Sequence, residues 1–245
     1  QLVLARVERL GQHDGIQLAG GRRAALYVGD LIVVCLGDRY APDQFEGVGE
    51  TTDDGRCELL AAGGVAGTVR HRHGRMGTAT ALRVLACLGD ARAQPINIRR
   101  YAIDLPSAGG ACTVPVVLVV GSSMNAGKTT ACASLIHGLS QAGCRVGAVK
   151  VTGTGSFGDV QSYADAGACE VLDFTDAGYA STYRAEMSAL EKAARSMVAE
   201  LVRRDCEVVV VEVADGLFQR ETAQLLASPP WRAALHGVVF AAGDA

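Results

Sequence analysis

Two patterns of hydrophobic and polar positions divide the chain near residue 110. Before that point, short apolar runs separated by turn residues predict strands over residues 2–7, 24–28, 31–36, 64–69 and 96–103, and one helix over residues 80–88. These elements predict a small β-rich domain over residues 1–110, either a barrel or a sandwich. Residues 106–115, which include a Gly-Gly pair, are the expected linker.

From residue 116 the pattern changes to strands that alternate with helices. A continuous β-branched run predicts a buried strand over residues 116–120, and further strands are predicted over residues 145–151, 207–213 and 238–242. Amphipathic stretches predict helices over residues 129–142 and 184–204. The alternation predicts an α/β domain over residues 111–245 with a mostly parallel, doubly wound sheet.

Composition narrows the class of protein. The 245 residues are 49% apolar and carry a formal charge of −3, which excludes intrinsic disorder as the main state and argues against a nucleic-acid partner. No apolar run approaches the ~18 residues of a spanning helix, and no signal-peptide pattern opens the sequence, so we expect a cytoplasmic protein without a membrane partner. The eight cysteines include no Cys-x-x-Cys pair, which excludes a zinc ribbon and predicts buried thiols in a reducing compartment.

Lysine is scarce in this chain. Of 23 basic residues, only Lys128, Lys150 and Lys192 are lysines, and the others are arginines. A compact ammonium group is kept where a planar guanidinium cannot replace it. Lys128 and Lys150 therefore become candidates for chemistry.

The strongest motif is the segment 121–130, Gly-Ser-Ser-Met-Asn-Ala-Gly-Lys-Thr-Thr, which follows a buried strand and opens an amphipathic helix. This context is the one that a phosphate-binding P-loop (Walker A motif) requires. Lys128 is expected to reach the β- and γ-phosphates, and the Thr129 hydroxyl is expected to hold Mg²⁺. The strict pattern places its first glycine at position 122, where this chain has Ser122. Residues expected to bind nucleotide are Ser123, Asn125, Ala126, Gly127, Lys128, Thr129 and Thr130.

This loop resembles that of the dethiobiotin synthetases and their relatives, the cobyrinate amidotransferase ATPase domains and the molybdopterin-guanine dinucleotide accessory protein. The resemblance covers residues 116–245 and implies a P-loop NTPase that uses ATP and Mg²⁺. It also implies a lysine at the end of the second strand, which Lys150 matches, and a turn at residues 151–155 that meets substrate or γ-phosphate. Thr152 and Thr154 are the substrate candidates of that turn.

A third match is the segment 209–217, in which Glu212 corresponds to the glutamate that helps to hold Mg²⁺ in the synthetases. The chain departs from them at Ser123, where they carry aspartate, and at Asp215, where they carry glycine. Asp215 is therefore a further substrate candidate. The relatives continue beyond the strand that precedes Ala245, so either the α/β domain is truncated at its C-terminus or the missing part is supplied differently.

The residue pattern points to the same groups without the resemblance. Lys150 and Glu212 each end a predicted strand, at the sheet edge where ligands bind in open α/β folds. A second lysine near the phosphates would stabilise charge on the transferred group. Asp159, in contrast, is singled out by the resemblance: it is similar to an aspartate of the molybdopterin accessory protein and is a candidate ligand of metal or acceptor, although an N-cap role fits it as well. The predicted catalytic residues are thus Lys128, Lys150 and Glu212, and the predicted metal ligands are Thr129, Glu212 and Asp159.

Three functions remain open from the sequence. The first is an ATP-dependent ligase or phosphoryl transferase acting on a small-molecule acceptor, with an acceptor oxygen attacking the γ-phosphorus in line. The alternative is a nucleotide-dependent switch or scaffold that controls a partner protein, for which the β-rich domain would serve as a docking module. A polynucleotide kinase is the third reading, and the acidic net charge weighs against it. A homodimer, the choice between ATP and GTP, and the acceptor are left open.

Overall fold

The computed structural model describes residues 1–107 and 112–243, which cluster into two compact units. One unit comprises Gln1–Ala102 with the two later segments Thr154–Phe157 and Gly178–Tyr183. The other comprises Ile103–Gly153, Gly158–Ala177 and Arg184–Ala245. We call them the β-rich unit and the α/β unit. Of the predicted linker, residues 108–111 lie outside the described part of the chain. In that part, no helix combines the length and the apolar character needed to cross a lipid bilayer.

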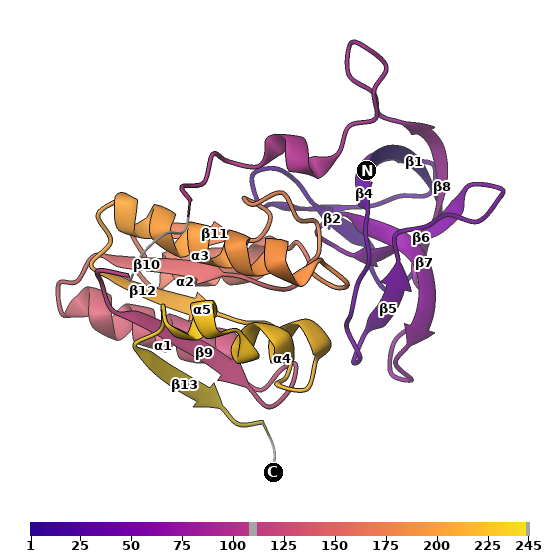
Figure 1. Cartoon of the computed structure of the whole chain (residues 1–245). Helices are drawn as coiled ribbons and strands as arrows, with labels where there is room; N and C mark the ends of the chain where they lie inside the picture. The colour runs from indigo at the N-terminus through magenta and orange to yellow at the C-terminus, as the bar shows by residue number, and fades with distance from the viewer. Residues whose placement is uncertain (108–111, 244–245) are drawn as a thin grey trace. The chain divides into compact units, whose positions relative to one another are not determined.

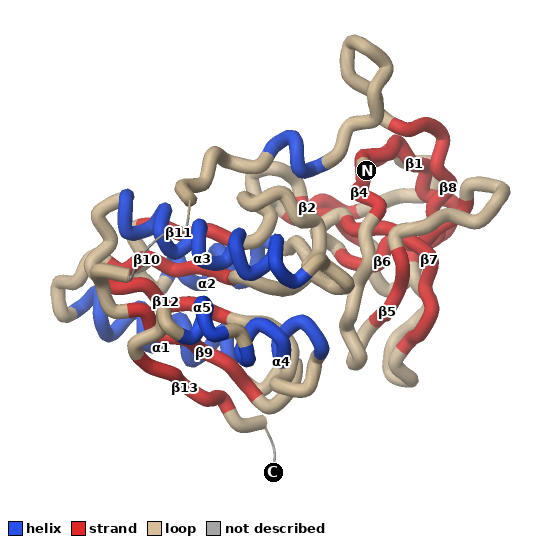
Figure 2. The backbone as a smooth tube through the Cα atoms, in the orientation of Figure 1, coloured by secondary structure: helices blue, strands red, loops and turns tan. Residues whose placement is uncertain are grey.

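The β-rich unit is built on a six-stranded sheet in the order β4-β1-β8-β6-β7-β5 (Figures 1 and 2). A further pairing of β4 with β7 turns five of these strands back on themselves, as in a small barrel. The core follows the two-residue period of strands, since Val3, Ala5 and Val7 of one strand are all fully buried. The strands are β1 (Leu2–Arg9), β2 (Gly15–Gln17), β3 (Arg23–Ala25), β4 (Leu31–Leu36), β5 (Phe45–Val48), β6 (Arg56–Ala61), β7 (Val65–Arg72) and β8 (Thr80–Cys87).

Two of the predicted elements in this unit are wrong. Residues 80–88 form no helix, because Thr80–Cys87 is the strand β8, which pairs with both β1 and β6. Residues 96–103 form no strand, because they contain the short 3-10 helix η1 (Ile98–Tyr101), whose N-cap Asn97 accepts a hydrogen bond from the Arg99 backbone. For β8 the sequence supplies apolar residues without showing the long-range partners that make them a strand, whereas η1 is a local turn that buries none of its residues.

The α/β unit has a five-stranded, fully parallel sheet in the order β11-β10-β12-β9-β13. This order and the helical crossovers confirm the predicted α/β class with a separate β-rich region. The strands are β9 (Val116–Gly121), β10 (Val146–Lys150), β11 (Glu170–Asp173), β12 (Val208–Glu212) and β13 (Gly237–Ala241). The helices are α1 (Lys128–Gln141), α2 (Phe157–Asp165), α3 (Met187–Arg203), α4 (Arg220–Ala227) and α5 (Pro229–Arg232).

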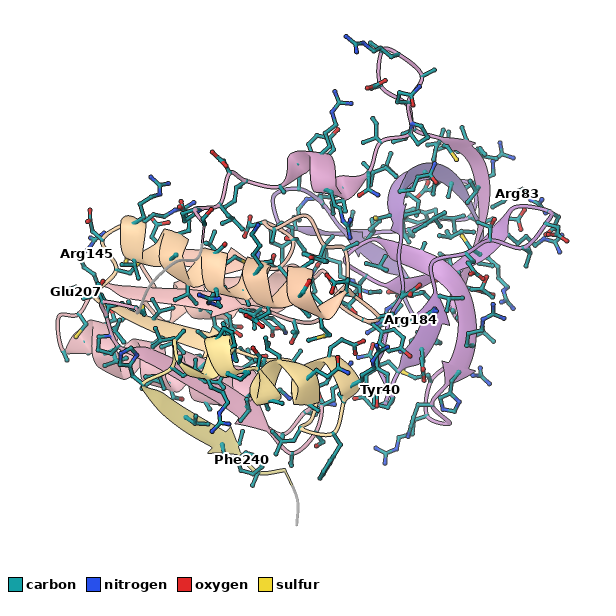
Figure 3. The ribbon with its side chains drawn as sticks, in the orientation of Figure 1. Tyr40, Arg83, Arg145, Arg184, Glu207 and Phe240 are labelled. Carbon is teal, nitrogen blue, oxygen red and sulfur yellow. The ribbon has the colours of Figure 1, made fainter. Side chains whose placement is uncertain are left out.

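Alternate residues of the central strands supply two separate cores, one on each face of the sheet. Val209 and Val211 pack with α3, α4 and α5, whereas Val208 and Val210 pack with α1 and α2 (Figure 1). Burial on both faces explains why β12 is an unbroken apolar run up to Glu212. β11 and β13 are the edge strands, and Figure 3 labels the exposed Phe240 of β13. At the start of β10 and β12, the Arg145 backbone N–H donates to Oε2 of Glu207 at 2.8 Å, and the Glu207 backbone N–H donates to the Arg145 carbonyl at 2.8 Å (Figure 3).

Candidate functional site

The loop between β9 and α1 is a tight backbone turn. Gly121 admits no side chain, because a Cβ there would lie 2.9 Å from Cγ of Lys128 and 3.0 Å from the Ala241 carbonyl oxygen. Asn125 and Gly127 adopt left-handed conformations, with φ of 63° and 91°. These turns lead the chain directly into the first turn of α1, so backbone N–H groups gather at a helix N-terminus.

Ser122 stands where the strict motif has glycine, and two hydrogen bonds hold it to the segment at the end of β13. Its backbone N–H donates to the Ala241 carbonyl at 3.0 Å, and its hydroxyl accepts from the Gly243 backbone at 2.8 Å. The serine thus joins the start of the loop to the end of β13. A side-chain oxygen in this position stabilises the turn by hydrogen bonds instead of by backbone freedom.

Lys128 is 6% exposed at the start of α1, and its ammonium group donates to the Ser123 carbonyl at 2.7 Å. Burial lowers the pKa of Lys128, while the nearby carboxylates of Glu212 and Asp215 act in the opposite direction. A largely desolvated cation at a helix N-terminus, with no acidic residue in the first turn, favours an anionic ligand.

Two of the predicted residues, Asp159 and Glu212, converge on Thr129. Its hydroxyl lies 3.1 Å from Oδ1 of Asp159 and 3.4 Å from Oε1 of Glu212. Lys150 forms an ion pair with Asp159 and lies 3.5 Å from Oε1 of Glu212. Lys150 and Glu212 are register partners at the carboxyl ends of β10 and β12, so the sheet itself brings them together.

The charges of this cluster are coupled. Burial lowers the pKa of Lys150, but the carboxylates of Glu212 and Asp159 outweigh it, and the pKa is raised. Lys150 therefore stays protonated, which compensates part of the negative charge of the two carboxylates. Cys132 of α1 is 1% exposed, and burial, followed by the charge of Glu212, raises the pKa of its thiol. Cys132 is thus a packed, unreactive thiol, as the sequence predicts, whereas Cys87 and Cys169 are exposed.

The oxygen ligands fit a hard divalent cation. Within residues 1–107 and 112–243, no group of three or more His, Cys, Asp or Glu side chains is placed to hold a metal. A hydroxyl with two carboxylates is instead the donor set suited to Mg²⁺, which keeps several waters and takes its other ligands from phosphate. Thr129, Glu212 and Asp159 are the residues that would hold it.

The substrate candidates fall in different places. Thr152 is 3% exposed, and its hydroxyl accepts a hydrogen bond from the Ala214 backbone at 2.8 Å. It therefore links the loop after β10 to the segment that contains Asp215, whose φ of 62° is left-handed. Thr154 belongs to the β-rich unit, where it forms a bridge with Ser181.

Two further residues shape the site and were missed in the sequence. Tyr163 of α2 is 1% exposed, and its hydroxyl donates to Oε2 of Glu212. Burial raises the pKa of Tyr163, and the Glu212 charge adds to the effect, so the phenol remains a donor. Gly216 approaches the phosphate loop so closely that a Cβ would lie 2.4 Å from the Ser122 carbonyl oxygen. The sequence analysis gives Tyr163 no role, because only its closeness to Glu212 in the fold marks it out.

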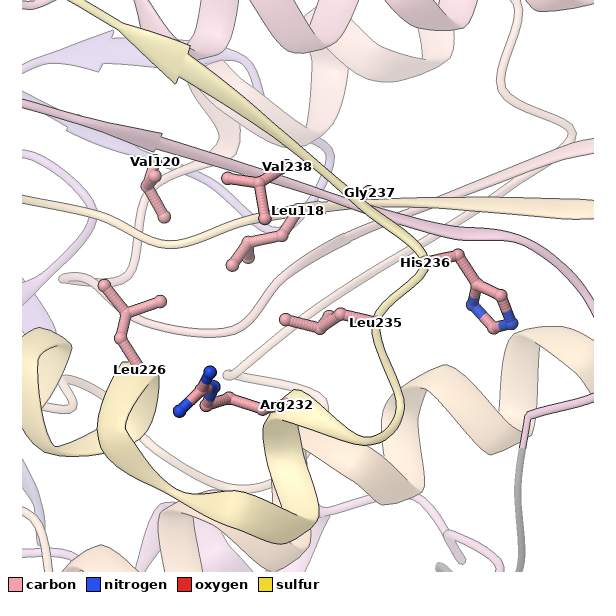
Figure 4. A pocket seen from close by; sticks show the side chains of 8 residues that line it. All are labelled: Leu118, Val120, Leu226, Arg232, Leu235, His236, Gly237 and Val238. Atoms are coloured by element: carbon pink, nitrogen blue, oxygen red, sulfur yellow. The ribbon is translucent and has the colours of Figure 1, made fainter.

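A separate pocket of about 380 Å³ lies between the sheet and α4–α5 (Figure 4). Its lining is mainly apolar, with Arg232 at one side, and includes none of the P-loop residues. It is lined by Leu118, Val120, Leu226, Arg232, Leu235, His236, Gly237 and Val238.

Comparison with known proteins gives structural similarity only. No family model and no curated protein matches the chain. The signal recognition particle 54 kDa protein from Aeropyrum pernix K1, solved with GDP, is similar over 54% of this chain and 30% of its own, with 24% identity and a TM-score of 0.37. The signal recognition particle receptor FtsY from Elizabethkingia anophelis is similar over 59% of this chain and 46% of its own, with 20% identity and a TM-score of 0.39. The chain thus spans less than half the length of these proteins.

The geometry of the α/β unit defines its class. A parallel sheet, a strand that ends in a tight loop, and Lys128 and Thr129 at the start of the following helix form an α/β fold with the strand–loop–helix arrangement that a P-loop requires. At this level the fold class inferred from the sequence is confirmed.

Proposed function

We propose that the α/β unit binds a purine nucleoside triphosphate with Mg²⁺ and cleaves or transfers its γ-phosphoryl group. The observation that carries this proposal is the convergence of Lys128, Thr129, Asp159 and Glu212 beyond the carboxyl ends of β9, β10 and β12. These residues come from separate elements, and each has the charge or donor type that a phosphate–magnesium site needs.

The roles of the residues follow from their positions. The backbone N–H groups of residues 123–130 and the Lys128 ammonium would bind the β- and γ-phosphates. Lys150, held charged between Asp159 and Glu212, would stabilise negative charge that develops during phosphoryl transfer. When bound, Mg²⁺ would neutralise phosphate charge, and Thr129 with the two carboxylates would hold it.

The first candidate for the biological role is a nucleotide-dependent switch. It is supported by the path of the chain: directly after Gly153, residues Thr154–Phe157 belong to the β-rich unit, and Gly178–Tyr183 belong there too. Both segments follow strands whose ends lie at the nucleotide edge, β10 and β11. A change at that edge would therefore reach the β-rich unit through the chain.

The second candidate is the ATP-dependent ligase or phosphoryl transferase. It is supported by the Lys150–Asp159 pair, which provides charged groups in addition to Lys128 and Thr129. The resemblance of the loop and of Lys150 to the dethiobiotin synthetase group belongs to this candidate. A small-molecule acceptor is expected only here.

One experiment tests the proposal and separates the candidates. Isothermal titration of the full chain with ATP and with GTP, each at millimolar concentration with Mg²⁺, is expected to show binding of at least one of them. Phosphate release is then measured with metabolite fractions, with protein fractions and with RNA 5′ ends. Stimulation by a metabolite indicates the ligase or transferase, stimulation by a protein indicates the switch, and labelling of RNA indicates a polynucleotide kinase. If neither nucleotide binds, the proposed function is wrong.

A further inference from the structure

The two oxygens of the Glu212 carboxylate have different surroundings. Oε1 faces the candidate magnesium site, 3.4 Å from the Thr129 hydroxyl and 3.5 Å from the Lys150 ammonium. Oε2 accepts the hydrogen bond of the Tyr163 hydroxyl. The whole side chain is 2% exposed, so water does not compete for either oxygen. The carboxylate is thus fixed at one oxygen and presents the other.

Helix α2 supplies two contacts to this site from one face. Asp159 and Tyr163 are four residues apart, so their side chains lie one above the other on the helix. Asp159 contacts Thr129 and Lys150, whereas Tyr163 contacts Glu212. Tyr163 is also the buried residue of α2, packed in the core that α1 shares with the sheet. The ring fixes the helix on the sheet, and the hydroxyl fixes the carboxylate.

We propose that Tyr163 is a positioning residue that orients Glu212 and thereby sets the affinity of the site for Mg²⁺. This inference rests on the proposed function, because it assumes that Glu212 serves a magnesium–nucleotide complex. A glutamate on a strand end has three side-chain torsions, and the buried Tyr163 hydroxyl at Oε2 favours the rotamer that points Oε1 toward Thr129. Without that donor, the carboxylate must be ordered when the metal binds, and this entropic cost weakens the affinity for Mg²⁺.

The test is Tyr163→Phe, which keeps the buried ring and removes the hydroxyl. Tyr101→Phe is the matched control, because Tyr101 is 62% exposed and lies in the β-rich unit. Nucleotide affinity is measured in EDTA, and the Mg²⁺ concentration that half-saturates nucleotide-dependent phosphate release is measured separately. For Tyr163→Phe we expect the half-saturating Mg²⁺ concentration to rise about tenfold, while affinity in EDTA stays within about twofold. Tyr101→Phe is expected to match the wild type in both.

The outcomes distinguish this inference from the proposed function. Unchanged Mg²⁺ dependence in a folded Tyr163→Phe protein overturns the positioning role and leaves the nucleotide site intact. Loss of nucleotide affinity in EDTA also overturns it, because the effect would then be on the fold of the loop. Absence of nucleotide binding by the wild type contradicts the proposed function itself.

A measurement on the wild-type protein covers the case in which the variant does not fold. With ¹³Cζ-labelled tyrosine, the resonance of Tyr163 reports the state of its hydroxyl. We expect it to shift as Mg²⁺ is added to the nucleotide complex, in parallel with saturation, while the resonance of Tyr101 stays in place. No shift of the Tyr163 resonance at saturating Mg²⁺ would overturn the inference.

Discussion

The Thr129 hydroxyl lies 3.1 Å from Oδ1 of Asp159, although the two residues are 30 positions apart in the chain. One comes from the phosphate loop and the other from α2, the helix that follows the next strand. Their contact brings α1 and α2, which are the first two helices that connect strands of the sheet, into one polar cluster. The predictions below follow from this cluster and from the backbone that supports it.

Replacing Lys128 by alanine is expected to weaken nucleotide affinity by about ten- to hundredfold, because the loop loses a charged donor to phosphate. Stability should not fall in parallel, since burial already disfavours the charged form of this lysine. Isothermal titration and thermal denaturation measure the two effects. Lys192→Ala, at an exposed position of α3, is the control and should bind as the wild type does. Equal affinity in both variants would contradict the assignment of the loop.

Gly216→Ala is expected to displace the phosphate loop. Its Cβ would lie 2.4 Å from the Ser122 carbonyl oxygen, so the backbone must shift at a cost of about 1–3 kcal/mol. We expect reduced nucleotide affinity together with a lower free energy of unfolding. Gly138→Ala provides the contrast, because it meets nothing within 4 Å on the surface of α1 and should stabilise the protein by about 0.5–1 kcal/mol. Urea denaturation measures the free energy of unfolding of both variants, and a loss of stability in Gly216→Ala with a gain in Gly138→Ala is the expected result.

Thr152→Val should uncouple the two loops that flank the site. The valine has nearly the same shape, but the buried Ala214 N–H loses its acceptor, which costs about 1–3 kcal/mol. Because Asp215 and Gly216 follow Ala214, nucleotide affinity should fall as well. Thr152→Ser keeps the oxygen and should retain most of the affinity. The prediction fails if valine and serine variants bind nucleotide equally well.

The stability contributed by Glu200 should depend on pH. Hydrogen bonds from Arg203, opposed by burial and aided by Arg204, lower the pKa of Glu200 from 4.5 to about 2 in the folded protein. The contribution is therefore complete above about pH 4.5 and is lost as the pH falls toward 2. Glu200→Gln should lower the free energy of unfolding at pH 7 by about 1.5 kcal/mol and by less at pH 3.5. The exposed Asp53→Asn serves as the control, and an equal loss at both pH values would contradict the role of the charge.

The sequence predicts much of the α/β unit because its elements are defined by local patterns. Residues 208–212 are all buried and consist of β-branched residues before Glu212, so neither periodicity nor length leaves an alternative to a strand. The phosphate loop is equally local, since ten consecutive residues carry it. In contrast, β8 alternates only weakly, and its strand conformation depends on pairing with β1 and β6, which lie far away in the chain.

In the site, too, the residues that local patterns mark are predicted from the sequence, and those that depend on long-range contacts are not. Lys128 and Thr129 follow from their motif, and Lys150 and Glu212 follow from their places at strand ends. Helix α2 was not predicted, because it is short and buries Tyr163 alone among its residues. The Tyr163–Glu212 contact joins residues 49 positions apart, and no spacing rule connects them. The sequence thus indicates the candidate groups of the site, whereas the fold is needed to find that Tyr163 contacts Glu212.

The discontinuous make-up of the β-rich unit limits how this protein can be dissected or recombined. Thr154–Phe157 and Gly178–Tyr183 belong to the β-rich unit. A fragment that ends at Ala102 would therefore lack these two segments, and a fragment that starts after Ala102 would contain them without the rest of their unit. No single cut yields two intact modules. Gene fusions that join only one half of this chain to another protein should therefore fold poorly. We expect the two units to be inherited together.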